Sequence, residues 1–399
     1  MPGALDGYRI IDLTQNVAGP LCTMILGDEG AEVIKVEPLD GGDHTRLAAR
    51  RRAGFSASFL NNNRNKRSIC IDLKAPQGVA LVKHLAAGAD VFIQNFRPGV
   101  VERLGLGEAE IRAAAPTIVY VSISGFGEIG PYAQKPVYDP VIQAYSGLAT
   151  VQAGSDEARP RMLRTILPDK LTAITASQAV TAALLARERS GEGQHVRLSM
   201  LEAVLQFLWA SDFGDQTLVG NEPPRQEAAS ATDLVYQTAD GWITVAVQTN
   251  AQWVALTRVL GRAEWLDDPR FATPALRQQN VDDRLRLTQE ALARDSSANW
   301  LDRLTEAGVP CAPVLTRNEV MRAPQVEALG LVVETTHPKA GRLRQTRPAA
   351  RFSRTPSEIR RGAPGLGEDT DAILAELGCP PEEVATLRAA GVINRSDDR

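Results

Sequence analysis

The feature that most constrains this fold is an alternation of short apolar runs and helix-like stretches over the first 125 residues. The run 9–13 is of strand type, a Gly19-Pro20 break precedes a helical stretch over 21–28, and a second apolar run follows Gly30 at 31–36. Two strands with a helix between them are typical of a βαβ unit, whose strands pair in parallel. The start of the chain therefore favours a parallel sheet.

The same pattern recurs further along the chain. Helices are predicted over 76–87, where Pro76 suits a helix N-terminus, over 108–115 and over 168–189. Strands follow them at 90–93, 118–123 and 195–199, and His195 in the last of these is interpreted as structural. Repeated units of this kind predict an α/β fold with a doubly wound, Rossmann-like parallel layer.

The pattern changes after residue 220, which indicates a second domain. Asn221-Glu222-Pro223-Pro224 is typical of a linker, and an Asp240-Gly241 turn between apolar runs predicts a β-hairpin. The later predicted elements are helices over 252–260, 275–293 and 297–306, short strands from residue 331, and a helix over 370–377. The predicted domains are a large Rossmann-like domain at 1–220, a smaller α+β domain at 225–325 and a C-terminal segment at 330–399 that returns to the large domain.

Composition and charge exclude several classes of protein. The 399 residues carry a net charge of −4, so no global basic field attracts nucleic acid. The first residues lack the basic and apolar regions of a signal peptide, and the most apolar helix candidate, 171–186, is too short to cross a bilayer. The four cysteines form no C-x-x-C pair. We expect a cytoplasmic protein that binds neither nucleic acid nor membrane.

A glycine-rich segment follows the predicted strand 118–123. Residues 125–130 match G-x-G-x-x-G, but a dinucleotide site also requires a helix that opens on these glycines, and the prolines at 131, 136 and 140 argue against one. An active-site loop remains plausible there, because ligands of open α/β sheets bind at the carboxyl ends of strands. The four histidines lack metal-ligand spacing, so we predict no metal site.

A dense polar and basic segment occupies residues 61–68. One interpretation is a solvated loop; the other is a phosphate-binding loop, since Arg and Lys beside amide donors suit phosphate oxygens. Lys74, Arg97 and Arg103 add positive charge near predicted element ends, which favours a phosphate-rich small ligand.

Asp169 stands at the start of the long helix predicted over 168–189. It has two interpretations: an N-cap, whose carboxylate accepts free helix N–H groups, or a nucleophile. In the second, the helix N-terminus would favour the ionised carboxylate at neutral pH. The sequence pattern alone leaves both open.

Taken together, many segments resemble a known family over nearly the whole chain. The matching stretches are 5–13, 18–20, 30–37, 65–68, 72–74, 95–99, 125–127, 130–132, 191–196, 308–310 and 363–367. In number and order they resemble the class III CoA-transferases of the CaiB/BaiF family, which includes formyl-CoA:oxalate CoA-transferases.

The resemblance implies a fold and a site. It implies an interlocked homodimer, each subunit with a Rossmann-like large domain and a small domain. It implies that Asp169, which follows Tyr138-Asp139 and Ser146-Gly147 in the family order, is the catalytic residue. The implied coenzyme A contacts are Val17, Ala18, Asp72, Leu73, Lys74, Asn95, Phe96, Arg103, Val137, Tyr138 and Asp139. Two departures stand out: Pro38 replaces an Arg of formyl-CoA transferases, and Gln248-Thr249-Asn250 replaces their glycine-rich lid.

The implied reaction moves coenzyme A from an acyl-CoA donor to a carboxylic acid acceptor. It would proceed through an acyl-aspartyl anhydride and an aspartyl-CoA thioester on Asp169, with coenzyme A and its thioesters as substrates and no permanently bound cofactor. The alternative on the same fold is a 2-methylacyl-CoA racemase, whose relatives use a His-Asp pair; here Tyr138 precedes Asp139. A third hypothesis is a protein that binds coenzyme A without catalysing a reaction. The presence of Asp169 at the family's catalytic position disfavours it.

Overall fold

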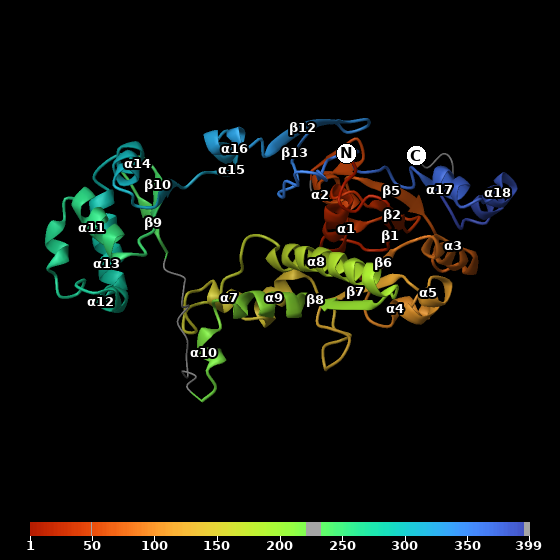
Figure 1. Ribbon diagram of the computed structural model, residues 1–399, viewed down its shortest axis with the longest axis horizontal. Helices are drawn as coiled ribbons and strands as arrows, with labels where there is room; N and C mark the ends of the chain where they lie inside the picture. Colours follow the sequence, from red (N-terminus) through yellow and green to blue (C-terminus); the bar gives the residue numbers. More distant parts are fainter. Residues whose placement is uncertain (49, 221–232, 395–399) are drawn as a thin grey trace. The chain divides into compact units, whose positions relative to one another are not determined.

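The computed structural model of the protein describes residues 1–48, 50–220 and 233–394. It divides into two compact units, of which one takes the described residues of Met1–Ser230 and Gly330–Arg399 and the other those of Ala231–Leu329 (Figure 1). The predicted linker at 221–224 lies outside the described residues.

A six-stranded sheet forms the centre of the first unit. Its strands are β1 (Arg9–Asp12), β2 (Glu32–Glu37), β5 (Lys66–Cys70), β6 (Val91–Gln94), β7 (Val119–Ser124) and β8 (His195–Ser199). They lie in the order β5-β2-β1-β6-β7-β8, and every neighbouring pair is parallel. By position in the chain this is the order 3-2-1-4-5-6 of nucleotide-binding sheets. The predicted α/β fold with a parallel sheet is confirmed.

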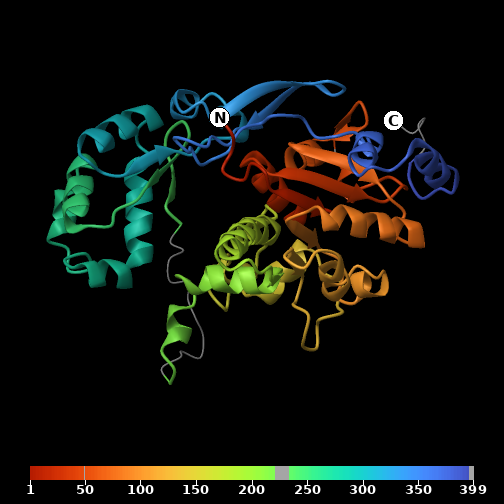
Figure 2. The ribbon, with the colours of Figure 1, turned by 45° about the vertical axis from the view of Figure 1, so that its right-hand side comes forward.

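Helices cover both faces of this sheet, and the four inner strands β2, β1, β6 and β7 are buried on both sides, whereas the edge strand β8 is only partly buried. On one face, α1 (Ala18–Asp28) and α8 (Leu167–Ser190) pack Leu26 and Val180 against Ile10 and Val33. The other face is covered by α3 (Pro76–Ala87), α5 (Glu108–Ala114), α17 (Thr370–Glu376) and α18 (Pro381–Ala389). Figure 2 shows the sheet from a second direction, with the long helix α8 beside it. Apolar burial on both faces accounts for the apolar strand runs in the sequence.

Shorter elements complete the first unit. They are η1 (His44–Leu47), β3 (Arg51–Arg52), β4 (Phe55–Ser56), α2 (Ala57–Asn62), α4 (Val100–Arg103), α6 (Asp139–Tyr145), α7 (Leu148–Val151), α9 (Met200–Trp209), α10 (Gly214–Thr217), β12 (Val332–His337) and β13 (Gly341–Thr346). The strands β12 and β13 form an antiparallel hairpin, and Gln345 of β13 donates from Nε2 to the Leu60 carbonyl at 3.0 Å.

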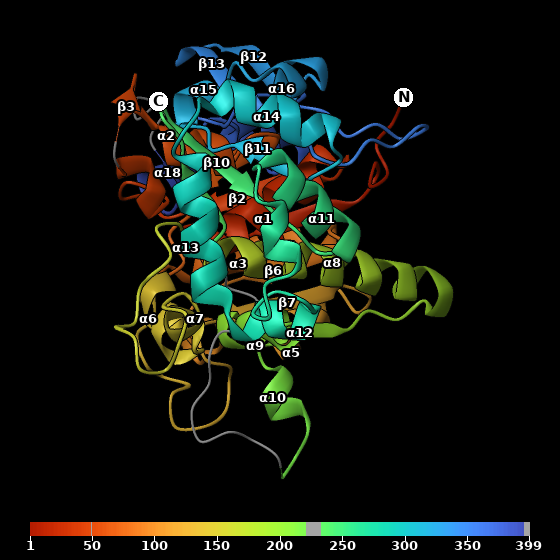
Figure 3. The same cartoon turned by 90° about the vertical axis from the view of Figure 1, so that its left-hand side faces the viewer.

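The second unit is a small α+β body with its own core (Figure 3). Its elements are β9 (Val235–Gln237), β10 (Trp242–Val245), α11 (Asn250–Val259), η2 (Ala263–Leu266), α12 (Pro274–Gln279), α13 (Val281–Leu292), α14 (Ser297–Glu306), β11 (Cys311–Pro313), α15 (Arg317–Val320) and α16 (Pro324–Ala328). The sheet is antiparallel in the order β11-β10-β9, which confirms the predicted hairpin at Asp240-Gly241. Trp253, Trp265 and Phe271 form its aromatic core.

Two local predictions are wrong. The predicted helix 275–293 is two helices, because Asn280 between them has a non-helical backbone conformation, with φ of −106° and ψ of 39°. The Asn280 side chain donates to the Leu276 carbonyl at 2.9 Å at the end of the first helix. The predicted break at Gly19-Pro20 lies inside the first turn of α1, where a proline is tolerated because the first N–H groups of a helix have no partner within it.

Candidate active site

The strand order places a crevice between the carboxyl ends of β1 and β6. The order reverses between these two strands, and in open α/β sheets ligands bind at such a switch point. The segments that follow the two strands are joined there: Asn95 accepts the Gln15 N–H at 2.9 Å and donates to the Gln15 carbonyl at 2.8 Å.

A cavity of about 200 Å³ opens at this edge of the sheet. Six of the sequence-predicted residues line it: Ala18, Asn95, Phe96, Val137, Tyr138 and Asp169. The remaining predicted residues, all described by the structure, lie outside this cavity: Val17, Asp72, Leu73, Lys74, Arg103 and Asp139. Val17 directly precedes α1, residues 72–74 follow β5 at the same edge, Arg103 ends α4, and Asp139 is buried behind Asp169.

Several lining residues were missed by the sequence analysis. They are Gln15, Asn16, Pro98, Ile123, Ser124, Ala133, Lys135 and Met200. Arg97 also lines the cavity, so the predicted positive charge near the ligand is present through Arg97 and Lys135. Lys135 places its ammonium 4.2 Å from the centre of the Tyr132 ring. Most of these residues lie in loops, where the sequence has no periodic pattern. They can be identified only from the structure, in which the loops come together around the cavity.

Asp169 is the third residue of α8 and does not cap that helix. The N-cap is Ile166, which makes no side-chain cap. The carboxylate of Asp169 instead lies near the backbone N–H of Ala18, at the start of α1. The N-cap interpretation of Asp169 is therefore wrong, since its carboxylate faces a different helix and the cavity.

A second carboxylate lies behind Asp169. Asp139 accepts the backbone N–H of Asp169 on Oδ2 at 3.2 Å and is only 3% exposed. Gln143 of α6 holds Asp139 by donating from Nε2 to Oδ1 at 2.6 Å, while its own Oε1 accepts the Leu163 N–H at 2.9 Å. Gln143 thus connects Leu163, in the loop before α8, to Asp139 at the start of α6. No sequence motif predicts this contact.

These surroundings set the charge of Asp169. Burial, and then the negative charge of Asp139, raise the pKa of Asp169 to about 6, and the Ala18 N–H opposes that rise. A backbone N–H at a helix N-terminus does favour the ionised form, as expected, but this donor belongs to α1 and its effect is smaller than that of burial and of Asp139. With a pKa of about 6 the carboxylate is still mostly ionised at pH 7, and it becomes protonated just below.

The glycine-rich segment closes one wall of the cavity. A Cβ on Gly125 would lie 1.9 Å from Cγ1 of Val137, so only glycine permits this approach of the two loops. The next helix after the glycines is α6, which begins at Asp139. No helix opens on Gly125–Gly130 in this described part of the chain, so the segment lacks the geometry of a dinucleotide site.

The polar segment 61–68 is neither a solvated loop nor a phosphate loop. Arg64 forms an ion pair with Asp28 at 2.6 Å, and Lys66 forms one with Asp12 at 3.0 Å. Asn63, Arg64 and Lys66 are buried. Both sequence interpretations are wrong because these charges are neutralised inside the protein.

His195 lies at the start of β8, away from the carboxyl edge that carries Asp169. Its Nε2 is 2.9 Å from the Ser122 hydroxyl, and burial lowers its pKa. Among the described residues no group of His, Cys, Asp and Glu is placed to hold a metal ion. The described helices also include none with the length and apolar character to cross a membrane.

Comparison with known proteins supplies the family. The sequence profile of CoA-transferase family III matches residues 5–370. The chain is 34% identical over 401 residues to the Homo sapiens succinyl-CoA:glutarate CoA-transferase, covering 98% of this chain and 90% of that protein. It is 34% identical over 384 residues to the Acetobacter aceti acetyl-CoA:oxalate CoA-transferase, covering 95% and 97%.

A solved structure agrees in fold. The crystal structure of a CAIB/BAIF family protein from Brucella suis superposes with a TM-score of 0.82 at 31% identity, covering 94% of this chain and 100% of that one. Sequence and structure thus agree over nearly the whole length. The chain belongs to CoA-transferase family III, the class III CoA-transferases, and is an enzyme that transfers coenzyme A between an acyl-CoA thioester and a carboxylic acid.

Proposed function

We propose that Asp169 is the nucleophile of this transfer. The observation that carries the proposal is the position of its carboxylate, which lines the cavity at the switch point of the sheet and lies beside the Ala18 N–H. A carboxylate that is ionised at neutral pH attacks a thioester carbonyl without first losing a proton.

The proposed sequence of bonds needs no other reactant. An Asp169 oxygen bonds to the acyl carbon, the C–S bond breaks, and an acyl-aspartyl anhydride and coenzyme A thiolate form. The thiolate attacks the aspartyl carbonyl and releases the first acid, which leaves an aspartyl-CoA thioester. The acceptor carboxylate displaces the thiolate to form a new anhydride, and the thiolate then takes the new acyl group and restores Asp169.

Each step passes through a tetrahedral oxyanion that needs hydrogen-bond donors. We assign the Ala18 N–H and backbone N–H groups of the Gly125–Gly130 loop to this task, since Ala18 and, from the loop, Gly125 and Phe126 line the cavity. The Gly127 N–H already donates to the Ser124 hydroxyl at 3.1 Å, so other N–H groups of the loop would contact the substrate. Water hydrolyses anhydrides, so the proposed reaction also requires that the bound substrates exclude water from the cavity.

Small dicarboxylic acids are the proposed acceptors. The named relatives act on succinyl-CoA with glutarate and on acetyl-CoA with oxalate. Arg97 and Lys135 place positive charge in the lining of the cavity, which suits substrates that carry carboxylate or phosphate groups. We propose that coenzyme A extends from the cavity along the same edge toward residues 72–74 and Arg103.

Trapping of the intermediate tests the proposal. The enzyme is incubated with succinyl-CoA and then with hydroxylamine, which attacks thioesters and anhydrides but scarcely reacts with a free carboxylate. We expect a hydroxamate mass on the peptide that contains Asp169, and none in enzyme treated without succinyl-CoA. Label on Asp139 or Asp72 would move the nucleophile, and a panel of acyl-CoA donors that all transfer without labelling would overturn the covalent mechanism.

We also propose that the enzyme works as an interlocked homodimer. Apolar side chains are exposed on two helices of the large unit: Phe207 and Trp209 of α9 are each 49% exposed, and Ile174 of α8 is 57% exposed. A second subunit would cover such surface. Light scattering should give twice the 43.0 kDa of one chain, and a monomer mass at working concentrations would overturn this proposal.

A further inference from the structure

The turn between β1 and α1 leads to the Ala18 N–H. Two buried ion pairs, Lys35–Asp43 and Lys66–Asp12, lie against this turn. Thr14 opens this turn and Pro20 lies in the first turn of α1. A Cβ on Gly19 would lie 2.2 Å from Cβ of Thr14, so the turn folds closely onto itself. Whatever fixes Thr14 and Pro20 therefore fixes the direction of the Ala18 N–H.

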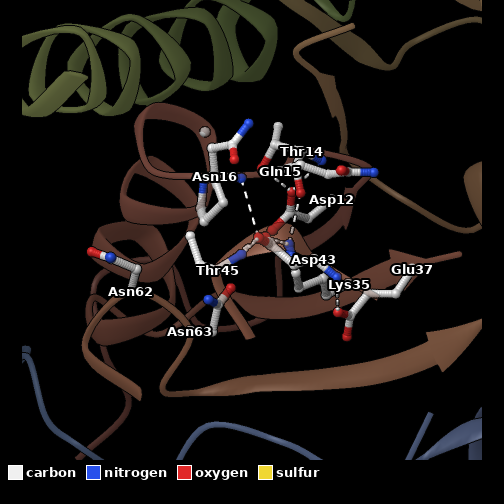
Figure 4. Close-up of polar contacts among 12 residues, drawn as sticks. Asp12, Thr14, Gln15, Asn16, Lys35, Glu37, Asp43, Thr45, Asn62 and Asn63 are labelled. Carbon is white, nitrogen blue, oxygen red and sulfur yellow. Dashed lines mark hydrogen bonds and ion pairs between the residues drawn. The ribbon is translucent and has the colours of Figure 1, made fainter. Parts of the chain in front are cut away.

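One buried lysine holds the first end of the turn. Lys35 of β2 is 0% exposed, and its Nζ donates to the Thr14 carbonyl at 2.7 Å. The same ammonium pairs with Oδ2 of Asp43, which is also 0% exposed, at 2.9 Å. Figure 4 shows Lys35 and Asp43 directly beneath the turn, with Thr14, Gln15 and Asn16 around them.

Asp43 holds the middle of the turn with its other oxygen. Oδ1 accepts the Asn16 N–H at 3.2 Å and is itself fixed by the Thr45 N–H at 2.9 Å and the Thr45 hydroxyl at 2.8 Å. Asn16 has a φ of 67°, a left-handed conformation that a residue with a side chain adopts only where its surroundings require it. The hydrogen bond from Asn16 to Asp43 is one such requirement.

A second lysine holds the other end. Lys66 of β5 is 0% exposed and donates from Nζ to the Pro20 carbonyl at 2.8 Å, to Oδ1 of Asn63 at 2.8 Å and to Oδ2 of Asp12 at 3.0 Å. The other carboxylate oxygen of Asp12, Oδ1, contacts the turn directly and accepts the Thr14 N–H at 2.8 Å. Each lysine thus joins a carboxylate to one carbonyl of the turn.

Stability alone does not explain these four charges. Burial of an ion pair is expensive, and a well-packed apolar pair of the same volume often serves a fold equally well. Both ion pairs lie against a turn whose Ala18 N–H lies beside the proposed nucleophile, so their polar groups have a role in positioning that turn. An ammonium ion can fix a carbonyl in direction, whereas an apolar side chain cannot.

We infer that Lys35 and Asp43 are positioning residues for the transfer reaction, which hold the Thr14–Pro20 turn so that the Ala18 N–H stays directed at the Asp169 carboxylate. The inference rests on the proposed role of Asp169 as nucleophile. Without the hydrogen bonds from Lys35 to the Thr14 carbonyl and from the Asn16 N–H to Asp43, the turn can relax from its left-handed conformation at Asn16. The Ala18 N–H then no longer favours the ionised carboxylate, and one donor to the oxyanion is lost.

The test is a double variant, Lys35→Met with Asp43→Asn, which at nearly constant volume removes both charges and the Lys35 donor to the Thr14 carbonyl, and leaves the Asn16 N–H with a neutral, weaker acceptor. We expect kcat to fall at least about tenfold, with a smaller change in KM, because a transition-state donor is displaced. We also expect the acid limb of the kcat profile to move to higher pH. The matched control is Arg64→Met with Asp28→Asn, which removes a buried pair at the far end of α1. It should alter thermal stability but leave the acid limb in place.

The outcomes separate the two proposals. A folded double variant whose acid limb and kcat match those of the control overturns the positioning role. If the double variant does not fold, Asp43→Glu keeps the ion pair but moves the carboxylate, and the same upward shift of the acid limb is required of it. Absence of hydroxamate on Asp169 in the unaltered enzyme would instead reject the nucleophile, whatever the variants do.

Discussion

Asp139 and Asp169 are joined by a hydrogen bond from the backbone of one to the carboxylate of the other, at 3.2 Å between N and Oδ2. The contact fixes the start of α8 and also brings a negative charge close to the proposed nucleophile. Burial of Asp169 is the main cause of its raised pKa, and the charge of Asp139 raises it further, so Asp139 both orients Asp169 and adds to this shift. If Asp169 is the nucleophile, as proposed, this relationship predicts how the activity of the enzyme depends on pH.

The first prediction concerns that pH dependence. Because the pKa of Asp169 is about 6, kcat/KM should fall about tenfold per pH unit below pH 6 as the carboxyl becomes protonated. Asp139→Asn removes the neighbouring charge but keeps an oxygen for the Asp169 N–H, so the acid limb should move down by roughly one unit. Asp90→Asn, at the opposite edge of the sheet, is the control and should leave the profile unchanged. An unmoved limb in Asp139→Asn would contradict the assigned cause.

The second prediction concerns stability. The folded-state pKa of Asp169 is raised from 3.8 to about 6, so the ionised form destabilises the fold above pH 6 and this penalty disappears as the pH falls toward 4. The shift corresponds to about 3 kcal/mol at most, and partial exposure reduces it to about 1–2 kcal/mol. Asp169→Asn should therefore be inactive yet melt at a higher temperature at pH 8. The gap in Tm should narrow to about a third near pH 4.5, because the penalty is lost completely only below the unfolded-state pKa of 3.8. An equal gap at both pH values would refute the explanation.

The third prediction concerns Gly125. Alanine at this position would place Cβ 1.9 Å from Cγ1 of Val137, a β-branched side chain that cannot simply rotate away. Gly125→Ala should displace the Val137 wall and lower kcat/KM at least about tenfold. Gly214→Ala in α10, where an added Cβ meets nothing within 4 Å, is the matched control. The measurement is the steady-state kcat/KM of both variants. Equal values for Gly125→Ala and Gly214→Ala would contradict the prediction and show that the cavity tolerates a displaced Val137.

The fourth prediction separates the transferase from a racemase. A racemase exchanges the α-proton of a chiral 2-methylacyl-CoA, which requires a base near the α-carbon. Tyr138 and Asp169 line the cavity, whereas His195 lies at the start of β8 with its Nε2 bonded to Ser122. Incubation in deuterated water without an acceptor acid should therefore give no α-deuterium by mass spectrometry. Rapid incorporation would support the racemase.

Local patterns in the sequence determined most of the elements. The predicted bounds 76–87, 195–199 and 297–306 coincide with α3, β8 and α14. Such agreement is expected where apolar spacing and a proline or glycine at the end mark an element, because these signals lie within one segment. The parallel sheet followed from the same reasoning. The position of Asp169 before a long helix made it a candidate as cap or nucleophile, and only the resemblance favoured the nucleophile.

The tertiary structure decided what the local signals could not. The burial of Lys66 and Arg64, the direction of the Asp169 pKa and the position of the Ala18 N–H all depend on groups that lie far away in the sequence. A segment with four asparagines and three basic residues, such as 61–68, is typical of a solvated surface until its partners are known. Charge is a long-range property and is settled by the neighbours that the fold supplies. Periodicity is a local property, so the sequence by itself determined the layers, and only the assembled sheet determined the chemistry at its edge.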